Sequence, residues 1–160
     1  MSSKPVRAYV AFQSSDRLAH TDQTTNSLIF DNVNLEHIHM RLNGKQVPDL
    51  QYEPDFTPLT DDYVREFTSL IQMNDKQVFD SQAGGSINYA DYKTLYPIFA
   101  FDFSAQDASL FERGSTADVE VRWKTRTTPA KDYHVVVVLQ SEAALEFHPI
   151  AENRVRVVQV

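Results

Sequence analysis

Tyr96-Pro97-Ile98-Phe99-Ala100-Phe101-Asp102-Phe103 is an apolar, aromatic-rich stretch with a single acid inside it. Apart from that acid, every residue after the Tyr-Pro step is apolar, so a strand formed here has no polar face to turn toward water. Strands that are buried on both faces have this composition, whereas half-buried strands alternate polar and apolar residues. The stretch therefore predicts a strand in the interior of a packed β-structure.

Strand patterns fill much of the remaining chain. Residues 6–13, 36–42 and 118–124 alternate between apolar and polar side chains, which indicates half-buried strands. Residues 133–139 carry four consecutive valines and predict a central strand. Shorter strands are expected at residues 27–30, 45–47, 144–147 and 154–160, and the polar residues 14–26 and 31–34 indicate a loop and a turn.

The dipeptide Asn43-Gly44 is the strongest hairpin signal in the chain, because both residues tolerate the positive φ angles of a tight turn. It is expected to join residues 36–42 to a short return strand. Pro48 is expected to end that return strand, because proline cannot donate to a strand ladder.

Two helices are expected in the middle of the chain. Tyr63, Phe67 and Leu70 fall at helical spacing and predict an amphipathic helix over residues 61–73. Three adjacent residues are candidates for its N-cap, namely Thr60, Asp61 and Asp62. Residues 86–95 predict a short second helix with Tyr89 and Tyr92 facing inward.

Composition narrows the class of protein. The chain has 160 residues, 42% of them hydrophobic, which suits one domain with a real core. It has no cysteine, which excludes disulfides, thiolate metal sites and cysteine nucleophiles. A net charge of −7 disfavours binding to phosphate backbones, so no nucleic-acid partner is expected. Neither a membrane-length apolar run nor an N-terminal signal core is present, so we expect no membrane insertion and an intracellular protein.

These patterns together predict an all-β fold. Roughly eight strands, hairpin-length links in the last third and one or two short helices inserted mid-chain point to an antiparallel sandwich. The helices are too few to cover both faces of a parallel sheet. We expect residues 1–160 to form a single domain of this kind.

The order of these motifs resembles the C-terminal jelly roll of double-jelly-roll major capsid proteins, especially those of Polinton/Maverick elements, adintoviruses and related capsid-like genes of animal genomes. The residues that carry the resemblance run from about Pro5 to Phe147. They are Ser27 to Phe30, Leu35 to Gly44 with its Leu-Asn-Gly ending, Val47-Pro48, Pro54 to Phe56, Asp62 to Leu70, Gly85 to Tyr92, Tyr96 to Phe103, Gly114 to Trp123 and Val135 to Phe147.

The resemblance implies an eight-stranded jelly roll and a structural role. A protein of this family self-assembles as a trimer, or capsomer, with other capsid subunits, in a virion capsid or inside the host cell before assembly. Members carry two jelly rolls and are much longer than this chain, so the chain matches one roll, as the C-terminal half of a longer protein or as a single roll. The family has no catalytic, cofactor or metal-binding residues to carry over, and no enzyme activity is expected.

Two other functions stay open at this point. One is a ligand-binding jelly-roll module, lectin-like or cupin-like, which includes a domesticated capsid gene. The other is a cupin-type enzyme that uses His37 and His39, which lie two apart on one face of a predicted strand. A solvated or interface face that happens to carry two histidines is favoured over a metal site, because no third ligand such as His134 is placed nearby by the sequence. A pH-sensitive contact is a further alternative.

The remaining polar candidates also have plain structural explanations. Asp102 is either an acid with a raised pKa or, as we favour, an acid at a strand end that bonds loop amides or an arginine such as Arg113 or Arg122. Trp123 shares a strand face with Val119 and Val121, which favours a core position over a sugar-stacking one.

Two charged segments complete the candidates. The basic segment of residues 122–126 is expected to be a solvated or salt-bridged face rather than a nucleic-acid contact. Asp61, Asp62 and Glu66 suggest calcium, but the loop pattern of a calcium site is absent and a helix N-terminus favours acids by itself.

Overall fold

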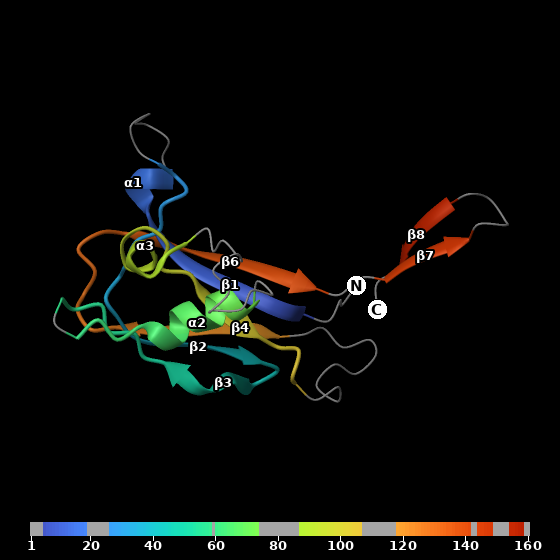
Figure 1. The fold of residues 1–160 in the computed structure, drawn as a ribbon, viewed down its shortest axis with the longest axis horizontal. Helices are drawn as coiled ribbons and strands as arrows, with labels where there is room; N and C mark the ends of the chain where they lie inside the picture. Colours follow the sequence, from blue (N-terminus) through green and yellow to red (C-terminus); the bar gives the residue numbers. More distant parts are fainter. Residues whose placement is uncertain are drawn as a thin grey trace.

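Two antiparallel β-sheets form the body of the protein (Figure 1). The computed structural model describes residues 5–18, 26–58, 60–73, 87–106, 118–141, 144–148 and 154–158. One sheet has the strand order β4-β1-β6 and the other has the order β3-β2-β5. The strands are β1 (Pro5–Ser14), β2 (Leu35–Leu42), β3 (Lys45–Tyr52), β4 (Phe99–Asp102), β5 (Val119–Thr125), β6 (Tyr133–Ser141), β7 (Ala144–His148) and β8 (Arg154–Val158). The helices are α1 (Ser15–Leu18), α2 (Val64–Met73) and α3 (Tyr89–Thr94).

The predicted all-β, antiparallel class is confirmed, and the number of strands in the two sheets differs from the prediction. Six strands form the two sheets, whereas eight were expected. β7 and β8 pair with each other as a separate two-stranded unit, which stands apart from the two sheets (Figure 1).

The hairpin prediction at Asn43-Gly44 is confirmed, since both residues have positive φ angles, 48° and 82°, and β2 pairs with β3 across them. The prediction that Pro48 ends the return strand is wrong, because β3 continues to Tyr52. The pairing register shifts between Ile38 and Met40 on β2, so the ladder is irregular opposite the proline. A proline is tolerated within a strand at such an irregularity.

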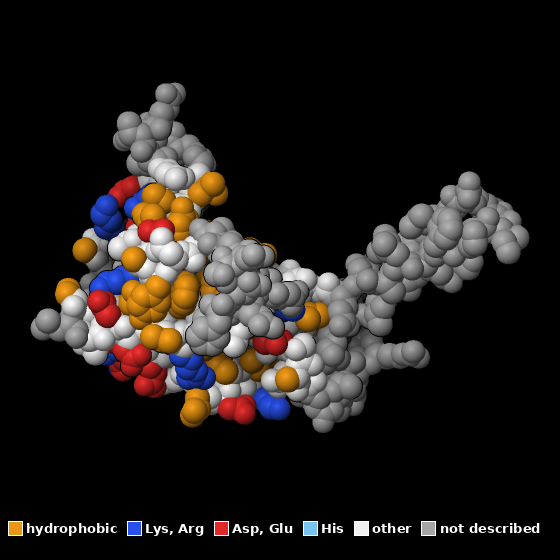
Figure 2. Space-filling model, in the orientation of Figure 1, with side chains coloured by type: hydrophobic (Ala, Val, Ile, Leu, Met, Phe, Trp, Pro, Cys, Tyr) orange, Lys and Arg blue, Asp and Glu red, His pale blue; other side chains and the backbone are white. Residues whose placement is uncertain are grey.

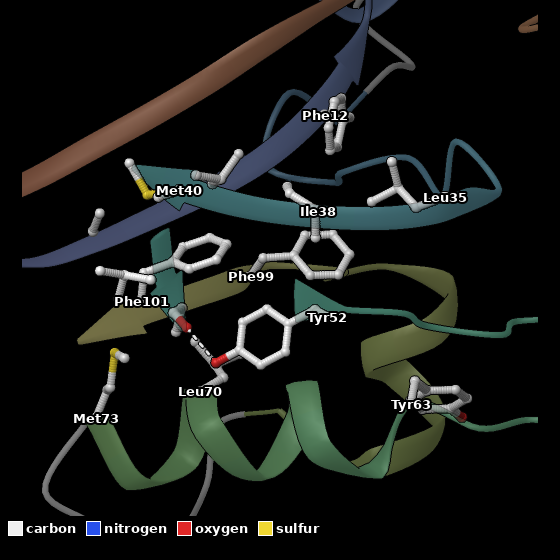
Figure 3. Packing of buried hydrophobic residues seen from close by; sticks show 14 of the residues in the cluster. Phe12, Leu35, Ile38, Met40, Tyr52, Tyr63, Leu70, Met73, Phe99 and Phe101 are labelled. Atoms are coloured by element: carbon white, nitrogen blue, oxygen red, sulfur yellow. Dashed lines mark hydrogen bonds between the residues drawn. The ribbon is translucent and has the colours of Figure 1, made fainter. Parts of the chain in front are cut away.

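The core lies between the two sheets and beneath α2 (Figure 3). β4 contributes Phe99, Ala100 and Phe101, all of which are fully buried, and Phe103 follows them into the core. The burial predicted for this stretch is therefore confirmed. The other buried residues of this core include Ala8, Val10 and Phe12 of β1, Leu35, Ile38, Met40 and Leu42 of β2, and Leu70 and Met73 of α2.

β4 has one paired edge and one edge that faces side chains. Its paired edge bonds to β1, with Phe101 opposite Ala8 and Phe99 opposite Val10. On the other edge, the Tyr52 hydroxyl donates to the Ala100 carbonyl at 2.9 Å (Figure 3), and the Tyr92 hydroxyl donates to the Ile98 carbonyl at 3.0 Å. Successive carbonyls of a strand alternate in direction, so these two carbonyls, two residues apart, point to the same side. Among the described strands none pairs with this edge, and two tyrosine hydroxyls bond two of its carbonyls instead.

Stacked aromatic rings attach both helices to the body. Tyr63, which precedes α2, lies between Phe56 and Tyr89 with ring centroids 5.1 Å and 4.4 Å away. Phe67 of α2 meets the ring of Tyr92 edge-on at 5.6 Å. Tyr92 is fully buried, as predicted, whereas Tyr89 is partly exposed and does not face fully inward.

The helix boundaries differ slightly from the prediction at the N-terminal end. α2 begins at Val64 instead of residue 61, because Asp61 adopts a left-handed φ of 41° and the first helical bond runs from Phe67 N–H to the Tyr63 carbonyl at 3.1 Å. α3 begins at Tyr89, where the Asn88 side chain accepts a hydrogen bond from the Asp91 amide. This is the N-cap arrangement typical of asparagine.

Three further predictions are corrected. Residues 27–30 form a turn and irregular backbone in place of a strand, and α1 lies within the segment predicted to be a loop. The valine-rich β6 is not a central strand, because among the described strands it pairs only with β1. An unbroken apolar run is typical of central strands, so the position of this run at an exposed edge is unusual.

Replacing either tyrosine on the β4 edge is expected to destabilise the fold. Tyr52→Phe leaves the buried Ala100 carbonyl without a donor, which costs about 1–3 kcal/mol in the free energy of unfolding, and Tyr92→Phe does the same to the part-buried Ile98 carbonyl, with a cost toward the lower end of that range. Denaturant unfolding measures the change. The control is Tyr96→Phe, whose hydroxyl bonds to no residue of the described segments and whose loss is expected to cost less than about 0.5 kcal/mol. Equal effects of all three substitutions would contradict the role assigned to the two hydroxyls.

Candidate functional site

The outer face of the β3-β2-β5 sheet gathers most of the polar candidates. On β2, Ile38, Met40 and Leu42 point into the core, so His37, His39 and Arg41 point outward. On the neighbouring strand β5, Lys124, Arg122 and Glu120 lie opposite these three residues in turn. We call these six residues the outer face.

His37 and His39 lie together as the spacing predicts, with stacked rings whose centroids are 6.1 Å apart. Burial lowers the pKa of His39, and the neighbouring charges of His37, Arg122 and Arg41 lower it further. His134 lies opposite Gln13 on the other sheet and is no third ligand. Within the described residues no group of three potential metal ligands comes together.

All three cations of the basic segment have partners within the protein. Arg122 pairs with Glu120 at 3.0 Å, and Lys124 pairs with Glu36 at 2.8 Å. Arg126 donates to the Pro54 carbonyl at 3.4 Å. Exposed pairs of this kind contribute only about 0–1 kcal/mol each to stability, so their main effect is to pattern charge on this face. The segment matches the predicted salt-bridged face.

Asp102 lies at the end of β4 with an exposed side chain, and its carboxylate accepts a hydrogen bond from the Ser104 amide at 2.8 Å. This is the strand-end role that the sequence favoured, filled by a loop amide. Asp102 lies opposite Arg7 of β1 in the β-ladder. Arg122 belongs to the other sheet, and Arg113 lies outside the described residues.

Trp123 differs from the prediction, because it is not a buried core anchor. Its side chain is 44% exposed, although it does point toward the other sheet and meets Phe12 edge-on at a centroid distance of 5.7 Å. β5 is the last strand of its sheet as described, so the inner face of the strand is only partly covered at this position.

The acids near α2 take separate roles. Asp61 pairs with Lys93 of α3, whereas Glu66 turns into the core and is only 3% exposed. Figure 2 shows acidic side chains gathered near the amino-terminal end of α2. The ligands of a calcium site are not assembled here, because Glu66 points away from Asp61 and into the protein. Burial raises the pKa of Glu66 above its ordinary value, while backbone hydrogen bonds and Arg65 act in the opposite direction.

Two features escaped the sequence analysis. One is a cleft of about 520 Å³ where β1, β3, α2 and β4 meet, lined by Arg7, Asp49, Ser69, Gln72, Asp102 and Gln106 among others. The apolar and aromatic part of the lining consists of Val47, Pro48, Tyr52, Met73 and Phe101. The cleft therefore has the mixed apolar and polar walls that small-molecule sites have, and it leaves the ligand-binding alternative open. The residues that line the cleft come from distant parts of the chain, so no local sequence pattern predicts it. The other feature is the exposed edge of β6, for which the lack of charged residues between positions 133 and 141 was an available signal.

Comparisons with protein-family models, with curated proteins and with solved structures found no match to this chain. In the segments that the structure describes, none of the helices has the length and apolar character needed to cross a bilayer.

The lowered pKa of His39 predicts a loss of stability on acidification. In the unfolded chain His39 takes up a proton near pH 6.5, whereas in the folded chain it does so only at lower pH. Its contribution to stability is therefore fully present above pH 6.5 and is lost as the pH falls through the folded pKa. His39→Gln should flatten that part of the stability profile, measured by thermal unfolding at a series of pH values. An unchanged profile in the variant would show that other groups cause the acid sensitivity.

The raised pKa of Glu66 predicts a contribution to stability with the opposite pH dependence. Its folded pKa is raised above the unfolded value of 4.5, so its contribution is most favourable below pH 4.5 and is lost as pH rises through the folded pKa. Glu66→Gln, which keeps the shape without the charge, is expected to be more stable than the wild type at neutral pH and no more stable at pH 4.5 or below. A variant that is less stable at neutral pH would contradict this expectation.

Proposed function

We propose that this protein is a structural subunit that self-assembles into capsomers of a viral or virus-derived shell, and that its two sheets are those of a single jelly roll. The family resemblance described above supports the proposal. In this role the protein acts in a virion capsid, or inside the host cell before assembly, and its partners are copies of itself and other capsid subunits.

The nested order of strand pairs is the observation that carries the proposal. The first strand of the body, β1, pairs antiparallel with the last, β6, and the second, β2, pairs antiparallel with the second to last, β5. The chain changes sheet between β1 and β2 and again between β5 and β6, and between them β4 returns to the sheet of β1. A long antiparallel hairpin rolled onto itself produces this nesting, and a jelly roll is such a rolled hairpin.

The inner strands depart from the regular pattern. β3 and β4 join the sheets beside β2 and β1, whereas in a regular eight-stranded roll the last strand is flanked on both sides. Here β6 occupies a sheet edge among the described strands. The structure has two three-stranded sheets, and the eight-stranded jelly roll is part of the proposal.

The outer face supplies a suitable flank for lateral contacts. It is a strand surface with charges of both signs at fixed positions, namely Arg41, Arg122, Lys124 and Glu120. Charges of this kind contribute little to the stability of one subunit but select partners and their orientation. Repeated contacts between unlike flanks close into rings, which is the route from a single roll to a capsomer.

Assembly of the complete gene product tests the proposal. The protein is purified over a range of concentrations, its mass is measured by mass photometry, and its particles are imaged by negative-stain electron microscopy. We expect trimers and shell-like particles, and we expect their fraction to respond to salt because charged flanks meet. A product that stays monomeric at the highest concentration and forms no particles would refute the assignment.

A further inference from the structure

The second edge of β6 has no neighbour among the described strands. β6 pairs with β1 through nine register positions, from Tyr133 opposite Ser14 to Ser141 opposite Pro5. None of the other strands in the described segments lies along its second edge. Half of its backbone N–H and C=O groups therefore point outward as a ready template for strand pairing. The chemistry of this edge fits a β-strand rather than a small molecule or a helix.

Apolar side chains are exposed on both faces of this edge. Val137 and Leu139, which are 40% and 46% exposed, share the core-side face with Val10 and Ala8 of β1. Val138, which is 55% exposed, lies on the opposite face beside Tyr9. A strand added to the edge would cover both apolar rows at once, and the second sheet covers neither fully.

β6 lacks the features that normally prevent strands from pairing edge to edge. Exposed edges in monomeric proteins usually carry lysine, proline, a bulge or an inward-pointing charge. The stretch from 133 to 141, Tyr-His-Val-Val-Val-Val-Leu-Gln-Ser, contains no Lys, Arg, Asp, Glu or Pro. Within residues 133 to 141, therefore, no like charges oppose the approach of an identical strand.

The order of polar and apolar side chains along β6 is nearly symmetric about its midpoint. This symmetry favours a second copy of β6 as the strand that adds to the edge. In an antiparallel pair of two copies centred on Val137, Val136 meets Val138, Val135 meets Leu139 and His134 meets Gln140. Apolar residues meet apolar ones and polar residues meet polar ones from His134 to Gln140, and only the outermost pair, Tyr133 with Ser141, is unlike. Cross-strand pairs of this kind are the unit of sheet stabilisation.

We infer that two copies of this chain associate edge to edge through β6, antiparallel about a two-fold axis at Val137. The two β4-β1-β6 sheets then form one continuous six-stranded sheet across the dimer. This contact is isologous, in which the same surface is used on both subunits. It does not rest on the capsid role, because it needs only the free edge and a second copy, and in a shell it would add a two-fold contact to the ring contacts proposed above.

A pair of single-cysteine variants of the full chain tests the axis. The chain has no cysteine, so Val137→Cys introduces its only thiol. At the proposed axis the two introduced thiols lie on directly opposite residues, whose Cα atoms are about 4.5–5.5 Å apart, within the range that a disulfide spans. Leu139→Cys is the control, since it lies on the same face with similar exposure but is separated from its own copy by four residue steps, about 14 Å.

Mild oxidation followed by non-reducing electrophoresis reads out the register. We expect Val137→Cys to form a covalent dimer and Leu139→Cys to remain mostly uncrosslinked. Equal crosslinking of both variants would indicate random collision or another register and would overturn the inference. Absence of crosslinking in both would overturn it as well.

A charge variant tests the contact without a covalent bond. Val138→Lys places two cations diagonally across the proposed pair, where like charges repel. Val64→Lys is a matched control, because Val64 of α2 is also 55% exposed and is remote from β6 in the sequence. Sedimentation velocity should show a concentration-dependent dimer for the wild type and for Val64→Lys, and a monomer for Val138→Lys. A wild type that is monomeric at all concentrations, or a Val138→Lys protein that dimerises like the wild type, would refute the pairing.

Hydrogen exchange separates a second copy from cover supplied by the same chain. If another segment of the chain covers the β6 edge, its outward amides are protected even in dilute monomer, and the inference fails. If a second copy covers it, protection rises with protein concentration and is lost in Val138→Lys. If the full gene product forms particles but Val137→Cys does not crosslink, the proposed function stands and the β6 contact is refuted. If Val137→Cys crosslinks but no particles form, the β6 contact stands and the proposed function is refuted.

Discussion

The unpaired edge of β4 is the constraint on which the rest of the structure depends. This strand has Phe99 and Phe101 in the core, and its outer edge lies beneath helices where water cannot serve its carbonyls. Buried backbone groups must find partners, and here the partners are the hydroxyls of Tyr52 and Tyr92. Those two hydroxyls come from β3 and α3, so the positions of both elements are tied to β4. The aromatic stack around Tyr63 then attaches α2 to the same corner.

The two edges of the β4-β1-β6 sheet therefore have opposite properties. At β4, tyrosine hydroxyls from the same molecule occupy the carbonyls of Ile98 and Ala100, where a neighbouring strand would otherwise bond. At β6, apolar side chains are exposed on both faces and no described strand lies alongside. The edge pairing proposed above would therefore direct association through this sheet to the β6 side. In the proposed structural role, this asymmetry would limit the ways in which copies join.

Local sequence signals predicted the parts of the fold that depend on neighbouring residues. The burial of Phe99 to Phe103, the turn at Asn43-Gly44 and the end of α2 at Met73 follow from composition, backbone preference and periodicity.

The failed predictions have a common physical cause. Whether a run of valines is central or at an edge, and whether Trp123 is covered, is set by the extent of the opposite sheet and not by the run itself. The bond from Tyr52 to Ala100 and the cleft at Asp102 join residues distant in sequence, and periodicity carries no information about them. Among the candidate sites, pairing of His37 with His39 was predictable from spacing, whereas the inward turn of Glu66 was not.

Native-state hydrogen exchange in β4 tests the central constraint most directly. The amide of Phe103 donates to the Val6 carbonyl at 2.8 Å, and the amides of Phe99 and Phe101 lie on the same edge. If the two tyrosines hold this strand in place, these amides exchange only through global unfolding, with a denaturant dependence equal to that of equilibrium unfolding. Exchange of the β4 amides through local opening, with little denaturant dependence while the β1–β6 ladder stays protected, would contradict the account.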